Sequence, residues 1–113
     1  MKITKVTVIR ANRGVYCKIM TDEGITGLGE SGAWGFQEAS AAAIKTFGEY
    51  LTGKDPMEIE HHWQYLYRFS HFRGAAIMGA LSAVDIALWD IKGKALGVPV
   101  WQLLGGKCRN KVR

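Results

Sequence analysis

The sequence predicts an α+β fold in which a three-stranded antiparallel meander precedes a bundle of three main helices. Residues 2–30 are rich in β-branched and aromatic side chains and are interrupted by short turns. From residue 36 onward, apolar residues recur with the helical period of about 3.6. Strands that come first and helices that follow are typical of the α+β class. The chain has 113 residues, of which 48% are hydrophobic, enough for one domain with its own core.

The three expected strands cover residues 2–10, 15–21 and 25–30. Each shows partial alternation or β-branched enrichment, which favours an extended backbone with one buried face. The first two strands are joined by the tight connection Ala-Asn-Arg-Gly at 11–14, and a second turn lies at 22–24. Consecutive strands with such short connections pair in antiparallel fashion, which gives a meander.

The first helix is expected from residue 36 to Gly53, which ends it. Its predicted buried face consists of Phe36, Ser40, Ala43, Ile44, Phe47 and Leu51. The run Asp-Pro-Met-Glu at 55–58 then offers a capping side chain, a proline at the first helical position and a carboxylate in the first turn. It predicts a second helix from there to about Phe69, followed by a polar-aromatic break at 70–74.

The long helix after this break has almost no polar face. Its main apolar stripe is Ile77, Leu81, Val84, Leu88, Ile91 and Ala95, with further apolar residues on its flanks. Gly97 ends it and Pro99 follows. A helix this apolar needs cover on several sides, and the remaining residues offer little, so we expect some partner and favour a homo-oligomer.

The net charge of +5 is concentrated at the C-terminal end of the chain. Lys107, Arg109, Lys111 and Arg113 account for most of it, so residues 1–106 carry only +1. A segment with almost no net charge lacks the strongly positive surface that binding to a nucleic acid requires. The four basic residues alternate with other residues, the period of a strand. We therefore expect a domain over 1–106, and in 107–113 the start of a strand whose sheet lies outside this chain.

The sequence contains no run of 18 uncharged apolar residues, so no membrane span or membrane association is expected. The N-terminus has the pattern of a strand and lacks the apolar core of a signal peptide, which places the protein in the cytoplasm by expectation. Cys17 and Cys108 are far apart in sequence and form no metal-binding pair. They are interpreted as ordinary thiols in a reducing compartment.

Residues 27–32, Gly-Leu-Gly-Glu-Ser-Gly, formally match the dinucleotide-binding pattern G-x-G-x-x-G. That pattern functions in a parallel βαβ unit, whereas here it closes an antiparallel meander, and Glu30 would add negative charge to a phosphate cradle. We favour a strand that needs close backbone approach.

Several ionisable residues on the expected helices have structural explanations. Glu58, His61 and His62 lie within one helical turn, but one such group without a second copy is a weak metal signal, and a solvated helix face is favoured. Asp85 and Asp90 lie on the apolar helix and could serve in acid–base chemistry. Pairing is the favoured role, since Lys94 follows Asp90 by four residues.

Two loops are the better candidates for binding. Trp34 and Phe36 lie in a loop between glycines, and His71 and Arg73 lie in the break before the long helix. Aromatic and cationic loop residues suit a lid over a polyhydroxylated anion, with Arg73 able to bind a carboxylate bidentately. The alternative is that the aromatic residues fill the core and that Arg73 only extends along the surface.

Four motifs carry a resemblance to a known family. A-L-S-A-V-D-I-A-L-W-D-I-K-G-K-A-L-G-V-P-V-W-Q-L-L-G-G at 80–106 and T-D-E-G-I-T-G-L-G-E at 21–30 resemble the N-terminal capping domain of the mandelate racemase and muconate lactonizing enzyme branch of the enolase superfamily. W-Q-Y-L-Y-R at 63–68 and H-F-R-G at 71–74 are most similar to the sugar-acid dehydratases of the galactonate and mannonate type.

The resemblance implies that catalysis and substrate selection depend on different domains. In such enzymes a (β/α)-barrel domain holds Mg and the acid and base that act on the carbon next to a carboxylate, so we expect no catalytic residue and no metal ligand in this chain. The capping loops select the acid-sugar substrate, and by position they correspond to Arg13, to 34–36 and to 71–73. The loop around Arg13 is shorter than is usual in the family. The second loop is therefore expected to contribute more to substrate selection. The chain would then be the capping domain of a dehydratase or racemase, without turnover by itself. A free-standing α+β interaction module is the alternative.

Overall fold

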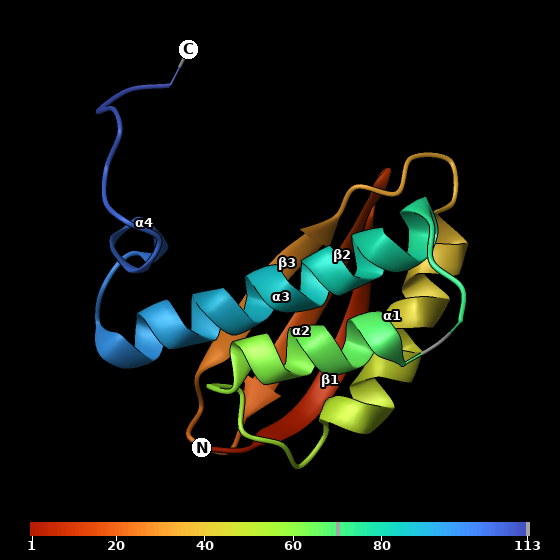
Figure 1. Ribbon diagram of the computed structural model, residues 1–113, viewed down its shortest axis with the longest axis horizontal. Coiled ribbons are helices and arrows are strands. Elements are labelled where there is room, and N and C mark those ends of the chain that lie inside the picture. Colours follow the sequence, from red (N-terminus) through yellow and green to blue (C-terminus); the bar gives the residue numbers. More distant parts are fainter. Residues whose placement is uncertain (70, 113) are drawn as a thin grey trace.

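The computed structural model describes residues 1–69 and 71–112 and has the predicted order of strands and helices (Figure 1). The elements are β1 (Ile3–Ala11), β2 (Gly14–Thr21), β3 (Thr26–Ser31), α1 (Gln37–Leu51), α2 (Ile59–Arg68), α3 (Ala75–Leu96) and α4 (Val100–Leu103). The α+β prediction is therefore confirmed. Within the described ranges, no helix combines the length and apolar character needed to cross a membrane.

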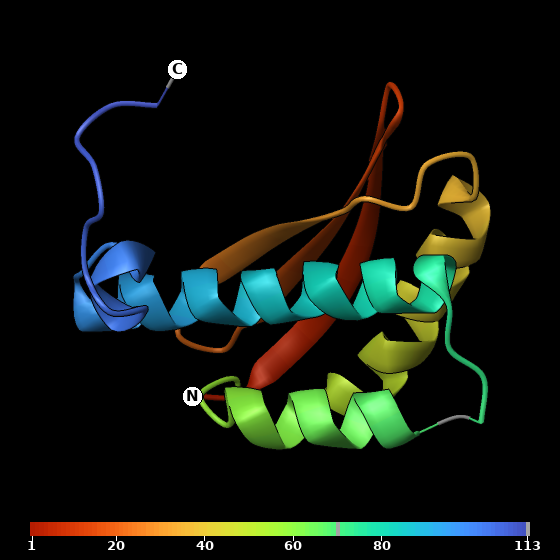
Figure 2. The same ribbon diagram turned by 45° about the horizontal axis from the view of Figure 1, so that its top comes forward.

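The sheet has the strand order β1-β2-β3, with both pairs antiparallel. Along β2, Val15, Cys17 and Ile19 are buried while the residues between them are partly exposed, so one face of the sheet points into the core. Helices α1 and α3 cover that face, with α1 against β1 and α3 against β3 (Figure 2). The alternation read from the sequence thus corresponds to a two-layer structure.

The contact between β3 and α3 depends on two glycines. A Cβ atom at Gly27 would lie 2.0 Å from the carbonyl oxygen of Ala87, and one at Gly29 would lie 2.0 Å from that of Ala83. Ala83 and Ala87 are themselves fully buried. The strand therefore lies directly on the helix backbone, which confirms close backbone approach as the reason for the glycines at 27–29.

The predicted start of the second helix is wrong. Instead of capping a helix that begins at Pro56, Asp55 accepts a hydrogen bond from the Met57 backbone N–H through Oδ1, at 2.9 Å. This closes a turn at 56–57, and α2 begins only at Ile59. Asp and Pro favour turns as strongly as helix starts, which explains the error. Residue 70, in the predicted break, lies outside the described residues.

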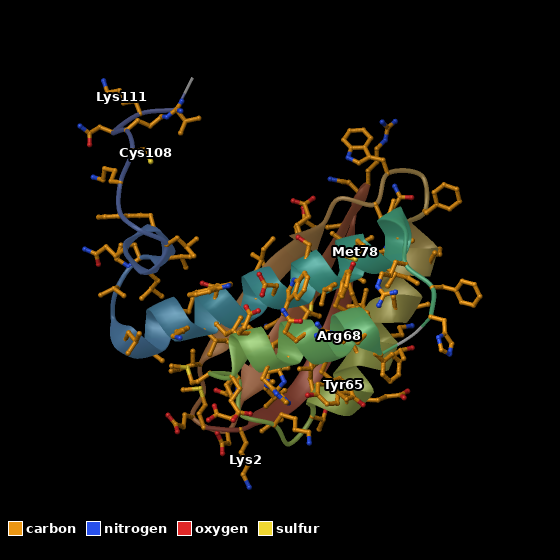
Figure 3. The ribbon with its side chains drawn as sticks, in the orientation of Figure 1. Lys2, Tyr65, Arg68, Met78, Cys108 and Lys111 are labelled. Carbon is orange, nitrogen blue, oxygen red and sulfur yellow. The ribbon has the colours of Figure 1, made fainter. Side chains whose placement is uncertain are left out.

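The chain after α3 contains one element that the sequence did not indicate. Gly97, with a φ of +68°, ends α3 as expected, and the chain then forms the single-turn helix α4. Residues 107–112 have no regular structure and are exposed, and the side chains of Cys108 and Lys111 lie on this tail away from the body of the molecule (Figure 3). The strand expected at 107–113 stays a prediction, and Arg113 lies outside the described residues.

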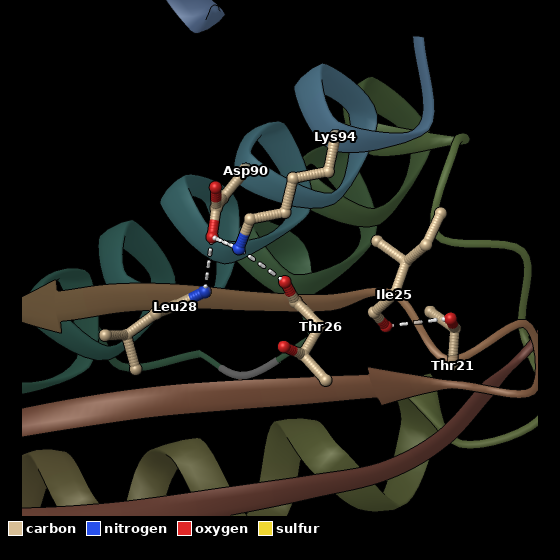
Figure 4. Close-up of polar contacts among 6 residues, drawn as sticks. All are labelled: Thr21, Ile25, Thr26, Leu28, Asp90 and Lys94. Atoms are coloured by element: carbon tan, nitrogen blue, oxygen red, sulfur yellow. Dashed lines mark hydrogen bonds and ion pairs between the residues drawn. The ribbon is translucent and has the colours of Figure 1, made fainter. Parts of the chain in front are cut away.

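A charged pair on α3 forms hydrogen bonds with backbone groups at the outer edge of β3 (Figure 4). Asp90 Oδ2 accepts a hydrogen bond from the Leu28 backbone N–H at 3.0 Å and pairs with Lys94 Nζ at 2.7 Å. Lys94 Nζ also donates to the backbone carbonyl of Thr26 at 2.7 Å. The pairing role expected for Asp90 is confirmed, and the pair occupies backbone groups that would otherwise be open to another strand.

We expect Asp90→Asn to lower the free energy of unfolding by about 1–2 kcal/mol, because it replaces a charge-assisted hydrogen bond and removes the attraction to Lys94. Most of this comes from the backbone contact, since the exposed ion pair alone contributes little. Urea unfolding of the chain checks it, with Glu49→Gln on the exposed face of α1 as the control. Equal midpoints for both variants would contradict this role of Asp90.

Candidate functional site

Two loops at one end of the molecule form a small cavity. It has a volume of about 150 Å³ and is lined by Arg13, Gly14, Glu30, Ser31, Gly32, Ala33, Trp34 and Gln37. Arg13 comes from the β1–β2 turn, where Asn12 has a left-handed φ of +53°. Gln37 Nε2 donates to the backbone carbonyl of Arg13 at 3.5 Å, which links this turn to the start of α1. The structure thus brings Arg13 and Trp34 together from different loops.

The loop between β3 and α1 is anchored at its base and exposed at its tip. The hydroxyl groups of Ser31 and Ser40 lie 2.6 Å apart in a buried hydrogen bond, and Ala33 is buried beside them. Trp34 and Phe36, in contrast, are 86% and 68% exposed. They do not fill the core of this domain, and their role in binding stays a prediction.

Arg13 is the cation available to this cavity. It is exposed, and across the described ranges it forms no ion pair, whereas its neighbour Arg10 is paired with Glu38 at 3.0 Å. A guanidinium group can donate two parallel hydrogen bonds to a carboxylate. The amide of Gln37 and the carboxylate of Glu30 can bind hydroxyl groups, and an indole ring can pack on an apolar sugar face. This set of groups suits a polyhydroxylated anion. Sequence reasoning missed Gln37 and Glu30, for which no motif gives a signal.

The segment that contains His71 and Arg73 lies at the end of the molecule where α3 begins (Figures 1 and 2). His71 is exposed and is not among the residues that line the Arg13–Trp34 cavity. The guanidinium group of Arg73 stacks over the Tyr67 ring at 4.3 Å, and Tyr67 stacks on Trp63. Arg73 is therefore held against α2 by a cation–π contact. The structure does not bring these two residues into one cavity with Arg13.

The histidines of α2 have different environments. His62 is fully buried, which makes the interpretation of a solvated face wrong for this residue, while His61 is exposed. His62 Nε2 lies 2.7 Å from the carbonyl oxygen of Asp55, and Nδ1 lies 3.2 Å from the Tyr50 hydroxyl. Because a carbonyl can only accept, Nε2 carries the hydrogen and Nδ1 is the acceptor for Tyr50 in the neutral ring. His62 thus ties α1 and α2 to the turn between them.

Among the residues that the structure describes, metal-ligating side chains do not gather at one place. In the part of the chain that the structure describes, no group of three or more His, Cys, Asp and Glu residues could hold a metal ion. Cys17 is buried, and burial raises the pKa of its thiol to about 12, so it stays protonated at neutral pH. A buried neutral thiol behaves as a small apolar core residue.

Asp85 on α3 is a carboxylate with a shifted pKa. It is half-buried, and burial raises its pKa above the ordinary value of 3.8, with a smaller contribution from the negative charge of Glu60. Among the described residues, no hydrogen bond or ion pair involves its carboxylate. The pairing expected for Asp85 is thus not found in residues 1–69 and 71–112.

We expect Asp85→Asn to stabilise the chain at pH 7. The folded-state pKa lies above the unfolded one, so ionisation favours unfolding, and stability falls as the pH rises through the folded-state pKa. The variant should lose this component of the pH dependence and match the parent below about pH 4. Urea unfolding of both proteins between pH 3 and pH 7, with Glu49→Gln as the control, measures it. A less stable variant at pH 7 would contradict the sign.

Residues 1–105 match the family described as "mandelate racemase / muconate lactonizing enzyme, N-terminal domain". The chain belongs to this family. Both the resemblance in the motifs and the α+β capping-domain fold are therefore confirmed.

Relatives of this mandelate racemase/muconate lactonizing enzyme N-terminal domain are much longer proteins. A D-galactonate dehydratase of Variovorax paradoxus (strain S110) is 51% identical over all of this chain and 30% of its own length. A member of the enolase superfamily from Salmonella Typhimurium has a TM-score of 0.92 and 40% identity, over 99% of this chain and 31% of its own. An enolase from Pantoea ananatis with bound D-gluconate and Mg has a TM-score of 0.91 and 43% identity, over 96% of this chain and 28% of its own. The chain spans about a third of such proteins.

Proposed function

We propose that this chain is the capping and substrate-selecting domain of an acid-sugar dehydratase of the enolase superfamily. The family match and the similarity to a D-galactonate dehydratase over the whole chain support this proposal. The dehydratase is more than three times as long as the aligned segment, which leaves room for a separate catalytic (β/α)-barrel domain. A racemase of the same branch is the alternative reaction, since both begin by removing the proton next to a carboxylate.

The observation that carries this proposal is the cavity shared by Arg13, Trp34 and Gln37. The Arg13 guanidinium binds the carboxylate or a distal hydroxyl group of the substrate, and Trp34 covers the carbon chain from above. Both side chains come from loops, which can close over a bound molecule and exclude water. His71 and Arg73, at the end where α3 begins, form a second and more distant part of the proposed lid.

The direction of the C-terminal tail supports a position of these loops over the active site of a following domain. The C-terminal tail and the tip of the β1–β2 turn both point toward the top of the molecule in the two views (Figures 1 and 2). A domain that follows the tail can therefore lie on the side to which the turn with Arg13 projects. The loops would then sit over its active site.

The chemical step is assigned to groups outside this chain. Proton removal needs a base and stabilisation of the negative charge that develops on the carboxylate, and the solved enolase from Pantoea ananatis contains Mg. The described residues do not fit a magnesium site, because they form no cluster of metal-ligating side chains. We therefore derive no step through Mg here, and residues 1–113 alone are expected to have no activity.

The experiment is a turnover assay of the full-length polypeptide on a panel of six-carbon sugar acids that includes D-galactonate and D-gluconate. We expect metal-dependent dehydration of one or a few of them, measured as 2-keto acid formation, and none by residues 1–113. Turnover by the short segment, or activity of the full-length protein only on substrates without a carboxylate, would overturn the proposal. Size-exclusion chromatography of the same preparation tests whether the full-length protein is the homo-oligomer that the apolar long helix led us to expect.

A further inference from the structure

The loop over residues 32–36, called loop 32–36 below, starts at a buried contact between β3 and two helices. Ser31, the last residue of β3, and Ser40, in the first turn of α1, are 6% and 0% exposed, and their hydroxyl oxygens lie 2.6 Å apart. Helix α3 contributes Gly79, where a Cβ atom would lie 2.7 Å from Ser31 Oγ and 3.3 Å from Ala33 Cβ. A strand end and two helices therefore meet at the base of the loop.

Backbone hydrogen bonds within the loop connect this base to the exposed tip. The Trp34 N–H donates to the carbonyl of Gly32 at 2.9 Å, and the Phe36 N–H donates to that of Ala33 at 3.3 Å. The Ser40 N–H in turn donates to the Phe36 carbonyl at 3.1 Å, which joins the loop to α1. Because the loop is bonded internally and at its far end, a shift of its base moves the exposed aromatic rings as well.

The first turn of α1 also holds the opposite wall of the Arg13–Trp34 cavity. Gln37 donates to the Arg13 carbonyl at 3.5 Å, and Glu38 pairs with Arg10 of β1 at 3.0 Å. In both ribbon views, α3 begins beside the loop that connects β3 to α1 (Figures 1 and 2). One helical turn thus contacts the turn that carries Arg13 and, through Ser40, the strand end that carries loop 32–36.

We propose that Ser40 is a positioning residue for substrate selection. Its hydrogen bond to Ser31 fixes loop 32–36 relative to Arg13 and thereby sets the shape of the cavity that binds the acid sugar. The inference rests on the proposed function, in which this cavity selects the substrate. Ser31 lines the cavity and Ser40 is not among the lining residues, so Ser40 acts through Ser31.

A buried hydroxyl pair is suited to this task because its bond has a direction. Both groups are shielded from water, so neither can exchange its partner for solvent without opening the structure. Apolar contacts at the same place would fill the space, but their attraction depends little on orientation. The stability of this contact and the position of the loop can therefore be changed separately.

The test is the kinetics of the full-length polypeptide on D-galactonate, or on the sugar acid of the panel that it dehydrates fastest. Ser40→Ala should raise KM at least fivefold and leave kcat within twofold, because the reacting groups lie outside this segment. Gly79→Ala pushes Ser31 Oγ from its position and should raise KM similarly, although alanine favours the helix more than glycine does. Thr46→Ala removes an exposed hydroxyl group of the same helix α1 and should change neither constant.

A double variant separates positioning from stability. Ser40→Ala alone leaves the Ser31 hydroxyl buried without its partner, so Tm should fall. Ser31→Ala combined with Ser40→Ala removes both polar groups, and Tm should return toward the parent value. The directional bond is still missing, so KM should stay at least fivefold higher. A KM that recovers together with Tm would overturn the positioning role, as would an unchanged KM in both Ser40→Ala and Gly79→Ala.

Hydrogen exchange of the full-length polypeptide without substrate separates this inference from the proposed function. Sampled from milliseconds by mass spectrometry, the backbone amides of 32–40 should exchange at least threefold faster in Ser40→Ala and Gly79→Ala than in the parent or in Thr46→Ala. An active dehydratase whose variants change neither exchange nor KM would leave the capping role intact and overturn the inference. Faster exchange in a protein that dehydrates no sugar acid would contradict the proposed function and support the attachment of the loop through Ser40.

Discussion

Replacing Gly29 with alanine is expected to be among the most damaging small substitutions in this domain. The added Cβ would lie 2.0 Å from the Ala83 carbonyl oxygen and 2.9 Å from the backbone nitrogen of Ala87. Neither is a flexible side-chain end that can move aside, so strand and helix must separate. Overpacking that shifts the backbone costs about 3 kcal/mol or more, a large part of the total stability of a domain this size.

Gly32→Ala is the matched control for this prediction. Gly32 lies three residues further along, and a Cβ there would meet no atom within 4 Å. We expect the unfolding midpoint in urea to fall strongly for Gly29→Ala, or the protein to be recovered unfolded, whereas Gly32→Ala should stay within about 0.5 kcal/mol of the parent. Similar stabilities for the two variants would mean that β3 does not lie directly on the α3 backbone.

Loss of His62 is expected to have the second largest effect. His62→Leu removes the hydrogen bond to the Asp55 carbonyl and the one from the Tyr50 hydroxyl, both of which join α2 to its surroundings. Because His62 is fully buried, the orphaned carbonyl cannot regain a water partner without opening the structure. An unsatisfied buried group costs about 1–3 kcal/mol, and the altered packing adds to this, so we expect a total of about 2–4 kcal/mol.

Two comparisons make the His62 prediction specific. His61→Leu changes the neighbouring, exposed histidine in the same way and should have an effect below about 0.5 kcal/mol. Tyr50→Phe removes only the hydroxyl partner and should cost about 1 kcal/mol. Thermal unfolding at constant pH measures all three. If His61→Leu proved as damaging as His62→Leu, the buried network would not be the cause.

The regular elements follow from local sequence patterns to a large extent. Alternation in 15–21 and the helical period after residue 36 predict the starts of β2 and α1 within one residue, because each pattern reflects one buried face. The predicted end of α1 at Gly53 lies two residues beyond Leu51, where the helix ends. The start of α2 could not be predicted, since Asp55 and Pro56 suit a turn as well as a helix. The single-turn helix α4 depends on contacts with α3 and has no pattern of its own.

The candidate site could be predicted only in part, for a different reason. Glycines and aromatic residues mark 32–36 as a loop, but burial of Ala33 and exposure of Trp34 depend on how that loop crosses the sheet. Likewise, no local pattern shows that Gln37 reaches the carbonyl group of Arg13. Arg73 has the chemistry of a carboxylate ligand, yet its position is set by Tyr67 on another helix. Long-range packing therefore decides which candidates meet.

The central claim, that the loops of this domain select the substrate of the full-length enzyme, is tested most directly by the kinetics of Arg13→Gln on D-galactonate. The account predicts that kcat/KM falls about tenfold to a hundredfold, mainly through a higher KM, because a charge-assisted contact to the substrate is lost. Lys5→Gln, an exposed cation on β1 outside the cavity, should leave both constants unchanged. Unchanged kcat and KM in Arg13→Gln, in a full-length enzyme that does turn over D-galactonate, would contradict the claim.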